Sequence, residues 1–458
     1  LDFQIQAVPY FGPSAVYPTG APAGAPAESY LCYFGCDTGY TGEYDTYHIF
    51  MKQANRTELE TRGDGSNVLL DGTFITAEGK IVYNCGVRYR GNSSRFNPYN
   101  FRIEMPRGEK LDGLRDINLN HVNALQQYMG MKIQSRVGFG NVAPRVKLCR
   151  LWLNQTEKSA QAGEDMYVRV QKLDANFIAD HYPDDTGNIY RGGVGPDKGG
   201  TLDYRATIPE YDNERSYRVE TNNPVTVWHE LQDLTLVLAQ DPSTYPTILT
   251  QRVNVRQWAR HYATHFAMDN REGGLCSPAS TTGDDYAIFA DPVDNRFDFL
   301  PWDMDTVIRN GNTTRNVWNS YGLSQIVQDF LFNPPIVPWF IGDIGDILHD
   351  EMSDENMIGL LNEMGSVVTA GYSNNVMNYV QGKRTFIDSF FNRDLTVSAG
   401  GFPASDNYMV VNAGSVTLSG EAPQAYTAEV RVNGSPAFWQ TRSNRWATVG
   451  PVGLNPGA

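Results

Sequence analysis

The chain has 458 residues, of which 41% are apolar and 12% aromatic, so it can bury a substantial core and lacks the composition of a disordered protein. Its 37 Lys and Arg residues against 52 Asp and Glu residues give a formal net charge of −15. Non-specific nucleic-acid binding depends on cations that neutralise phosphates, so we expect no nucleic acid among the partners. No apolar run reaches the roughly 18 residues that a spanning helix needs, and we expect no membrane span.

The first segment, 1–45, is rich in Pro, Gly and Ala and predicts an irregular arm. Such an arm is either a plain linker or a surface for self-assembly. The chain begins at Leu1, which we interpret as a mature or trimmed N-terminus. Among five cysteines, Cys32 and Cys36 could close a small loop in an oxidising compartment. Together with Asn-x-Ser/Thr triplets at Asn55, Asn92, Asn154, Asn312 and Asn433, this favours a secreted or cell-surface protein.

Segment 46–180 is strand-rich and predicts a small, twisted α+β lobe, which we call the N-lobe. A helix is expected inside 114–140, where Leu125, Tyr128, Met129, Ile133 and Val137 recur at helical spacing before a glycine. Alternating or β-branched runs predict strands at 47–51, 66–70, 72–76, 80–89, 101–105, 144–153 and 165–170.

Segment 181–398 predicts a helical C-lobe that would carry the catalytic loops. A hairpin-like pair of strands at 285–290 and 297–301 interrupts it. Its helices are expected at 224–239, 255–268, 324–332, 341–350, 353–364 and 374–393.

The last segment, 399–458, has alternating apolar and polar residues with glycines between them and predicts a β-sandwich-like module. The dipeptide Asn433–Gly434 is a hairpin turn signal. The segment stops early for a sandwich, so we expect a module that is incomplete or is completed by another chain.

Arginines and a small-residue turn follow one predicted strand. Arg88 and Arg90 are two residues apart and therefore share a face of that strand. The turn after them, which contains Gly91, Ser93 and Ser94, could present N–H groups and hydroxyls to a phosphate. A strand edge whose arginines pair with nearby carboxylates would have the same sequence.

Carboxylates also gather after apolar segments in the second half of the chain. Asp303 and Asp305 follow the buried-type strand 297–301, and Mg²⁺ typically takes one or two carboxylates plus substrate phosphates. Asp269 and Asn270 follow the helix 255–268, where a base beside a substrate hydroxyl would suit phosphoryl transfer. Surface carboxylates or a structural Ca²⁺ turn remain alternatives for the Asp-x-Asp pair.

The order of these segments resembles the spore-coat protein H (CotH) family of atypical protein kinases. The resemblance covers most of 47–395, about three quarters of the chain. It is carried by RGNSS, FRIEM, LRDINLN, DMYVRVQKLDANFI, GNIYRGG, SYRVETN, HFAMDN, FLPWDMD and FIDSFFNRDL, in that order.

The resemblance implies a two-lobed protein-kinase-like fold that uses ATP with Mg²⁺ or Mn²⁺ to phosphorylate Ser or Thr of an extracellular or coat protein. Asp269 would be the catalytic aspartate, and Asp303 with Asp305 and Asn270 would bind the metal. Phosphate-side contacts would come from Arg88, Arg90, Gly91, Ser93, Ser94, Gln171 and Arg191, and the cleft would lie between the strands of 101–170 and the two aspartate loops.

Several positions depart from the family pattern and leave catalysis open. Tyr99 stands where the family usually has Lys, and Gln171 stands where it has the Glu that pairs with this Lys. Arg191 replaces a common Lys, which keeps the charge but changes its shape. The alternative to an active kinase is therefore a catalytically lapsed, kinase-like structural or binding protein of an extracellular assembly. A glycoside hydrolase is a third class, which the motif order does not favour.

Overall fold

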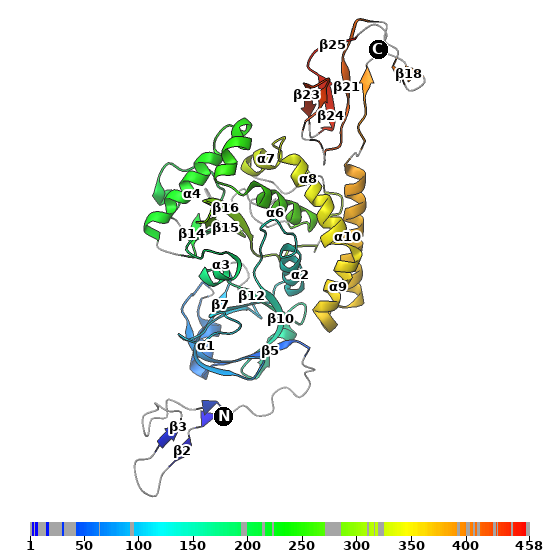
Figure 1. Ribbon diagram of the computed structural model, residues 1–458. Helices are drawn as coiled ribbons and strands as arrows, with labels where there is room; N and C mark the ends of the chain where they lie inside the picture. The colour runs from blue at the N-terminus through cyan, green and yellow to red at the C-terminus, as the bar shows by residue number, and fades with distance from the viewer. Residues whose placement is uncertain are drawn as a thin grey trace. The chain divides into compact units, whose positions relative to one another are not determined.

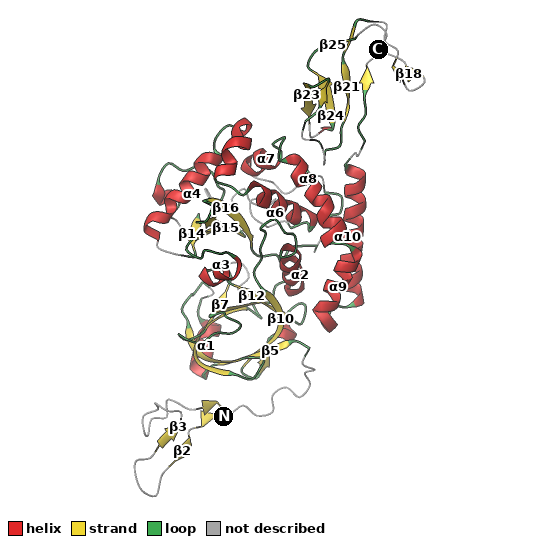
Figure 2. Cartoon of the chain, viewed as in Figure 1, coloured by secondary structure: helices red, strands yellow, loops and turns green. Residues whose placement is uncertain are grey.

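The computed structural model of the chain forms two compact units, Leu1–Tyr44 and Asp45–Ala458. The described residues are 2–3, 5–7, 15–17, 30–31, 43–63, 65–91, 96–193, 199–212, 216–221, 224–270, 285–308, 311–315, 317–318, 325–391, 394–399, 404–405, 408–409, 413–424, 427, 429–440 and 443–454. The chain is an α+β protein, as predicted (Figures 1 and 2). The domain boundaries predicted at 180/181 and 398/399 remain predictions.

The N-terminal unit contains two short antiparallel pairs, β1 with β4 and β2 with β3. These strands are Asp2–Phe3 with Tyr30–Leu31 and Ile5–Ala7 with Ala15–Tyr17. The predicted irregular arm therefore carries some regular strand pairing. Cys32 and Cys36 lie outside the described residues.

The second unit begins with a closed β-barrel (Figure 1). The ring closes because β10 pairs antiparallel with β12 on one side and parallel with β5 on the other. Around the ring the strands are β5 (Asp45–Phe50), β6 (Leu70–Ile75), β7 (Ile81–Arg90), β8 (Asn100–Glu104), β9 (Asp116–Asn120), β12 (Tyr167–Gln171) and β10 (Val146–Leu153), and β11 (Thr156–Glu157) pairs with β10.

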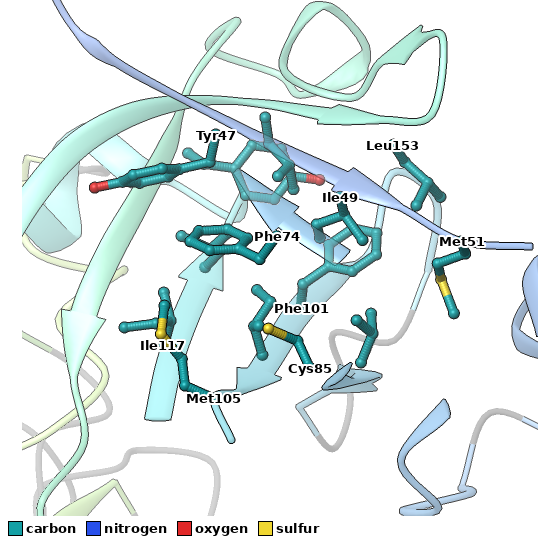
Figure 3. Packing of buried hydrophobic residues seen from close by; sticks show 14 of the residues in the cluster. Tyr47, Ile49, Met51, Phe74, Cys85, Phe101, Met105, Ile117 and Leu153 are labelled. Atoms are coloured by element: carbon teal, nitrogen blue, oxygen red, sulfur yellow. The ribbon is translucent and has the colours of Figure 1, made fainter. Parts of the chain in front are cut away.

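Alternating side chains of the barrel strands fill its interior. In β7, Cys85, Val87 and Tyr89 are buried, whereas Arg88 and Arg90 between and after them are only half-buried. Figure 3 shows the packed interior, to which Tyr47, Phe74 and Phe101 contribute rings and Cys85 a thiol. Burial raises the pKa of the free Cys85 and Cys149 thiols to about 12, which keeps both protonated and inert.

Three elements of the barrel region differ from the sequence prediction. The predicted strands 66–70 and 72–76 are one strand, β6. Helix α1 (Gln53–Thr61) was missed because it buries only Leu59 and so has no apolar periodicity to detect. Strand β9 was missed because its five residues include two asparagines, although four of the five are buried. The predicted helix in 114–140 is α2 (Ala124–Gln134).

The following region combines helices with a four-stranded sheet of order β14-β13-β15-β16. The predicted hairpin is β15 (Tyr286–Asp291) with β16 (Arg296–Pro301), whereas β13 (Asn188–Gly192) and β14 (Tyr217–Val219) were not predicted. The helices are α3 (Ala175–His181), α4 (Pro224–Leu238), α5 (Tyr245–Ile248), α6 (Val255–Ala267), α7 (Gln325–Leu331), α8 (Val337–Asp346), α9 (Asp354–Met364) and α10 (Ala370–Phe390).

Helix α6 is the central helix of this region, since twelve of its residues are buried. It begins where the side chain of Asn254 accepts a hydrogen bond from the Gln257 N–H. Gln257 and Trp258 then bind the backbone of β16, through Phe299 and Phe297. These contacts hold the first turn of α6 against β16, the strand that leads to Asp303.

The C-terminal segment forms a five-stranded antiparallel sheet of order β17-β21-β24-β23-β22, with two further two-stranded pairs. The predicted turn at Asn433–Gly434 is confirmed, because both residues have positive φ and join β22 to β23. The strands are β17 (Ser398–Ala399), β18 (Ala404–Ser405), β19 (Tyr408–Met409), β20 (Ser415–Val416), β21 (Leu418–Glu421), β22 (Arg431–Val432), β23 (Ser435–Gln440), β24 (Arg445–Thr448) and β25 (Val452–Gly453).

None of the helices in the described ranges combines the length and the apolar composition needed to cross a bilayer.

Candidate functional site

A chain of polar side chains leads from the barrel to the loop after β16. Arg90, at the end of β7, donates to the side-chain oxygen of Asn120, at the end of β9. Asn120 donates to Gln127 on α2 at 2.9 Å. Gln127 in turn donates to the backbone oxygen of Val122 at 3.2 Å and to Asp303 at 3.4 Å. Two strand ends, one helix and one loop are thereby joined around Asp303.

Trp302 lies between this network and a second arginine. The guanidinium carbon of Arg191 is 4.5 Å from the centroid of the Trp302 ring, and that of Arg90 is 5.9 Å from it. The indole is 4% exposed, so two cations are held over a buried aromatic surface. Burial lowers the pKa of Arg90 to about 10, and the neighbouring Asp303 opposes this shift.

The backbone of Asp303 adopts a conformation that residues other than glycine rarely adopt. Its φ is +46°, in the left-handed region, directly after β16. Burial raises its pKa, although Arg90 and Arg191 act in the opposite direction. A desolvated carboxylate beside two arginines fits a site for a cation and an anionic ligand together.

The loop after α6 and the loop after β16 are bonded to each other through Asn270. Its amide nitrogen contacts Met304 Sδ at 3.3 Å, and its amide oxygen accepts from the Thr306 hydroxyl at 2.8 Å. The Ile308 N–H also donates to the carbonyl oxygen of Met268 at 2.8 Å. Asp305 is half-buried between Met304 and Thr306, which are two of the partners of Asn270. The structure thus brings the predicted catalytic and metal-binding segments together.

Asp269 is 1% exposed at the end of α6, with a φ of +52°. Arg315 donates from Nε to its Oδ1 at 2.6 Å. The fully buried Lys383 of α10 lies nearby; burial lowers its pKa to about 7, and the charge of Asp269 opposes this shift. Asp269 is therefore a buried carboxylate with two basic neighbours.

Donor chemistry at this site is compatible with a nucleotide and a divalent cation. Asp303 and Asp305 supply carboxylate oxygens, and the arginines supply cations for phosphates. Asn270 fits the metal less well, since its oxygen already accepts from Thr306. Across the described ranges there is no group of three or more His, Cys, Asp and Glu side chains arranged for a metal, so a cation here would also need ligand or water oxygens.

Several predicted site residues lie away from the Asp303 network or outside the described residues. Arg88 donates to Asn67 at 3.1 Å rather than to the Asp303 network. Gln171 accepts from the Arg145 N–H at 3.1 Å and donates to Asp180 at 2.7 Å, at the opposite end of β12 from the strand end beside Asn120. Gly91 has a φ of +104°, as a turn after β7 requires, and Ser93 and Ser94 lie outside the described residues.

Two of the positions that depart from the family pattern, Tyr99 and Gln171, have local packing roles. The Tyr99 ring stacks on Tyr89 with centroids 3.9 Å apart, against the barrel core. Its backbone oxygen accepts from the Tyr167 hydroxyl at 2.8 Å. Gln171 bonds to the Arg145–Asp180 pair described above. Each residue is thus integrated into the structure of the barrel end where it lies.

Sequence reasoning did not single out Asn120, Gln127, Arg315 or Lys383. Asn120 and Gln127 are buried amides in segments otherwise read as apolar, which is the signal that could have drawn attention to them. Arg315 and Lys383 come from distant segments and carry no local motif.

Other polar residues, on α6 and in the β15–β16 turn, are engaged in local packing. His261 stacks on Phe299, and its ring lies 4.2 Å from that of His265, so this pair packs in the core. Asp291 and Asp294 accept backbone N–H groups of their own turn, and Asp294 also pairs with Arg296. These contacts stabilise the acidic turn.

His121, next to Asn120, gives stability a predicted pH dependence. Burial lowers its pKa to about 4, against about 6.5 in the unfolded chain. Below about pH 6.5, His121 binds a proton in the unfolded state but not in the folded state. Stability therefore falls as pH drops from about 6.5 toward 4. The loss reaches about 3 kcal/mol.

Urea denaturation of the wild type and of His121→Gln, repeated between pH 7.5 and 4.5, checks this dependence. The variant should lose less stability than the wild type over that range. Equal losses in the two proteins would contradict a buried neutral imidazole.

Comparison with known proteins agrees with the geometry. Residues 87–388 match the family model described as CotH kinase protein. This match spans the Arg90–Asp303 network and both aspartate loops and covers more than half of the chain, so the chain belongs to the CotH kinase family. A search of curated proteins finds no match to this chain.

Proposed function

We propose that this chain is a kinase with two lobes, the barrel and the helical region, that binds ATP with Mg²⁺ or Mn²⁺ between them. It would transfer the γ-phosphoryl group to a Ser or Thr hydroxyl of an extracellular or coat protein. The observation that carries the proposal is the Arg90–Asn120–Gln127–Asp303 network, which links a cation on the barrel to a carboxylate of the helical region.

Each described group has a defined task in this proposal. Arg90 and Arg191, held over Trp302, would bind phosphate oxygens. Asp303 and Asp305 would hold the divalent cation, which supplies charge neutralisation on the phosphates when bound. The bond from the γ-phosphorus to the β–γ bridging oxygen breaks and a bond to the substrate hydroxyl oxygen forms. ADP leaves, and Asp269 accepts the hydroxyl proton.

Asp269 is closed to a substrate hydroxyl in the conformation described. Its Oδ1 is paired with Arg315 at 2.6 Å, and its side chain is 1% exposed. A substrate hydroxyl must come within about 3 Å of either carboxylate oxygen to donate to it. The residues that cover Asp269, Arg315 among them, must therefore move before transfer.

The second candidate is a kinase-like structural or binding protein without catalysis. It is favoured by Tyr99 and Gln171, which are built into the barrel, and by the closed Asp269–Arg315 pair. In that function the N-terminal arm or the C-terminal sheet would provide self-assembly surfaces. A secreted or cell-surface location is part of both proposals.

A thermal-shift titration with ATP and Mg²⁺ or Mn²⁺ tests nucleotide binding. A ligand that binds only the folded state stabilises it by about 2.7 kcal/mol at a concentration of 100 times its dissociation constant. The wild type should therefore melt higher with nucleotide and metal together, and Asp303→Ala should lose this shift. Asp294→Ala, which alters an exposed carboxylate of the β15–β16 turn, is the matched control and should keep it.

No shift of the wild type at roughly millimolar nucleotide, where even weak complexes form, would reject the kinase and leave the lapsed protein. A shift that persists in Asp303→Ala would place the nucleotide elsewhere.

A further inference from the structure

Lys383 is a buried basic side chain without a hydrogen-bond acceptor. It lies on α10, is fully buried, and its ammonium has no hydrogen-bond partner in the part of the chain that the structure describes. The ammonium lies 3.9 Å from the centroid of the Phe266 ring on α6. This cation–π contact offsets only part of the free energy lost when the ammonium is removed from water. For folding alone, a residue such as Met would serve better at this position.

Burial lowers the pKa of Lys383 to about 7, and the carboxylate of Asp269 opposes this shift by favouring the charged ammonium. Arg315 lowers the pKa of Lys383 further, as expected of a cation in the same cluster. Two basic side chains therefore lie near one carboxylate, although only Arg315 is bonded to it among the contacts described.

The packing around α10 fixes Lys383 firmly. The Tyr379 hydroxyl donates to the Ala267 carbonyl oxygen at 2.7 Å, which ties α10 to the end of α6. A Cβ added at Gly382 would lie 3.0 Å from the Thr313 side chain, so α10 also packs closely against the segment that carries Arg315. Lys383 is therefore held on a 21-residue helix, whereas Arg315 lies in a loop.

We propose that Lys383 is a positioning residue for Asp269, whose charge it balances and whose orientation it maintains when Arg315 withdraws to admit a substrate hydroxyl. This inference rests on the proposed function, in which Asp269 accepts the hydroxyl proton. Once Arg315 leaves Oδ1, Lys383 still acts on the Asp269 carboxylate.

The test uses the full chain with the substitution Lys383→Met, which keeps an unbranched side chain one atom shorter and removes the charge. Transfer from ATP with Mn²⁺ is followed as phosphate release to water and as phosphate gained by the chain itself. We expect kcat to fall by about tenfold or more while the KM for ATP changes by less than about twofold, because positioning affects the transition state and not nucleotide binding. The melting temperature should stay or rise.

Arg384→Met is the matched control on the same helix. Arg384 pairs with Asp354 and donates to the backbone oxygens of Leu348 and Met352, so its loss should lower the melting temperature and leave kcat per folded molecule unchanged. If Lys383→Met keeps its kcat, or melts as low as Arg384→Met, Lys383 is structural and the inference is wrong.

A readout without turnover separates this inference from the proposed function. Lys383→Met should raise the melting temperature more in an Asp269→Asn background than in the wild type, because the ammonium has then lost its counter-charge. Equal shifts in the two backgrounds overturn the inference. Absence of nucleotide binding by the wild type overturns only the proposed function.

Discussion

Replacing Asp343 with alanine is expected to lower the free energy of unfolding by about 3–5 kcal/mol. Asp343 lies on α8 with 1% of its surface exposed, and both of its oxygens are bonded to arginines of α6. Arg256 binds it with two nitrogens, and Arg260 donates to Oδ1 at 2.9 Å. Without the carboxylate, the buried Arg260 keeps a charge whose strongest counter-ion is gone, which costs far more than an exposed pair would.

Urea denaturation followed by circular dichroism measures this loss. Asp294→Ala is the control, because it breaks a pair of partly exposed residues in a turn and should change stability by less than about 1 kcal/mol. If Asp343→Ala also stays within that limit, the α6–α8 ion pairs do not hold these helices together.

Gly130→Ala is expected to destabilise the protein by about 1–3 kcal/mol and to weaken nucleotide binding. A Cβ added at Gly130 would lie 2.8 Å from Cβ of Met304 and 3.3 Å from Val307, so α2 or the loop after β16 must shift. Gln127 is one turn away on α2, and its hydrogen bond to Asp303 is long, at 3.4 Å. The shift would therefore separate the polar network from the Asp303 carboxylate.

The same substitution on another helix provides the control. Gly359 lies on α9 with an exposed position and nothing within 4 Å of an added Cβ, so Gly359→Ala should stabilise the protein by up to about 1 kcal/mol. Opposite signs for the two variants, in urea denaturation and in the nucleotide thermal shift, are the expected result. Matching effects of the two alanines would mean that α2 does not press on the Asp303 loop.

The sequence allowed prediction of those parts of the site that depend on neighbouring residues. Asp303 follows an apolar strand and Asp269 follows a helix, and both patterns are visible in a few residues. The helix boundaries of α4, α6 and α9 were likewise predicted to within about two residues, because apolar spacing and caps are local signals. The order of motifs then led to the family that residues 87–388 confirm.

The remaining contacts of the site depend on residues that are far apart in sequence. Gln127 and Asp303 come from different elements, and no local pattern shows that α2 passes the loop after β16. Lys383 reaches the neighbourhood of Asp269 only because α10 packs against α6. Gln171 was assigned to the phosphate side by family order, whereas its contacts are with Arg145 and Asp180.

The closed barrel has a consequence for how the chain reaches its native state during synthesis. One pairing of the ring joins β5 to β10, in which Asp45 meets Cys149, about a hundred residues later in the chain. At about 5–20 residues per second, a ribosome needs roughly 5–20 s to make the intervening segment. Until then the apolar side of β5, with Tyr47 and Ile49, has no interior to enter. Chaperones that bind exposed strands in that interval should therefore raise the yield of folded protein more than those that act after release.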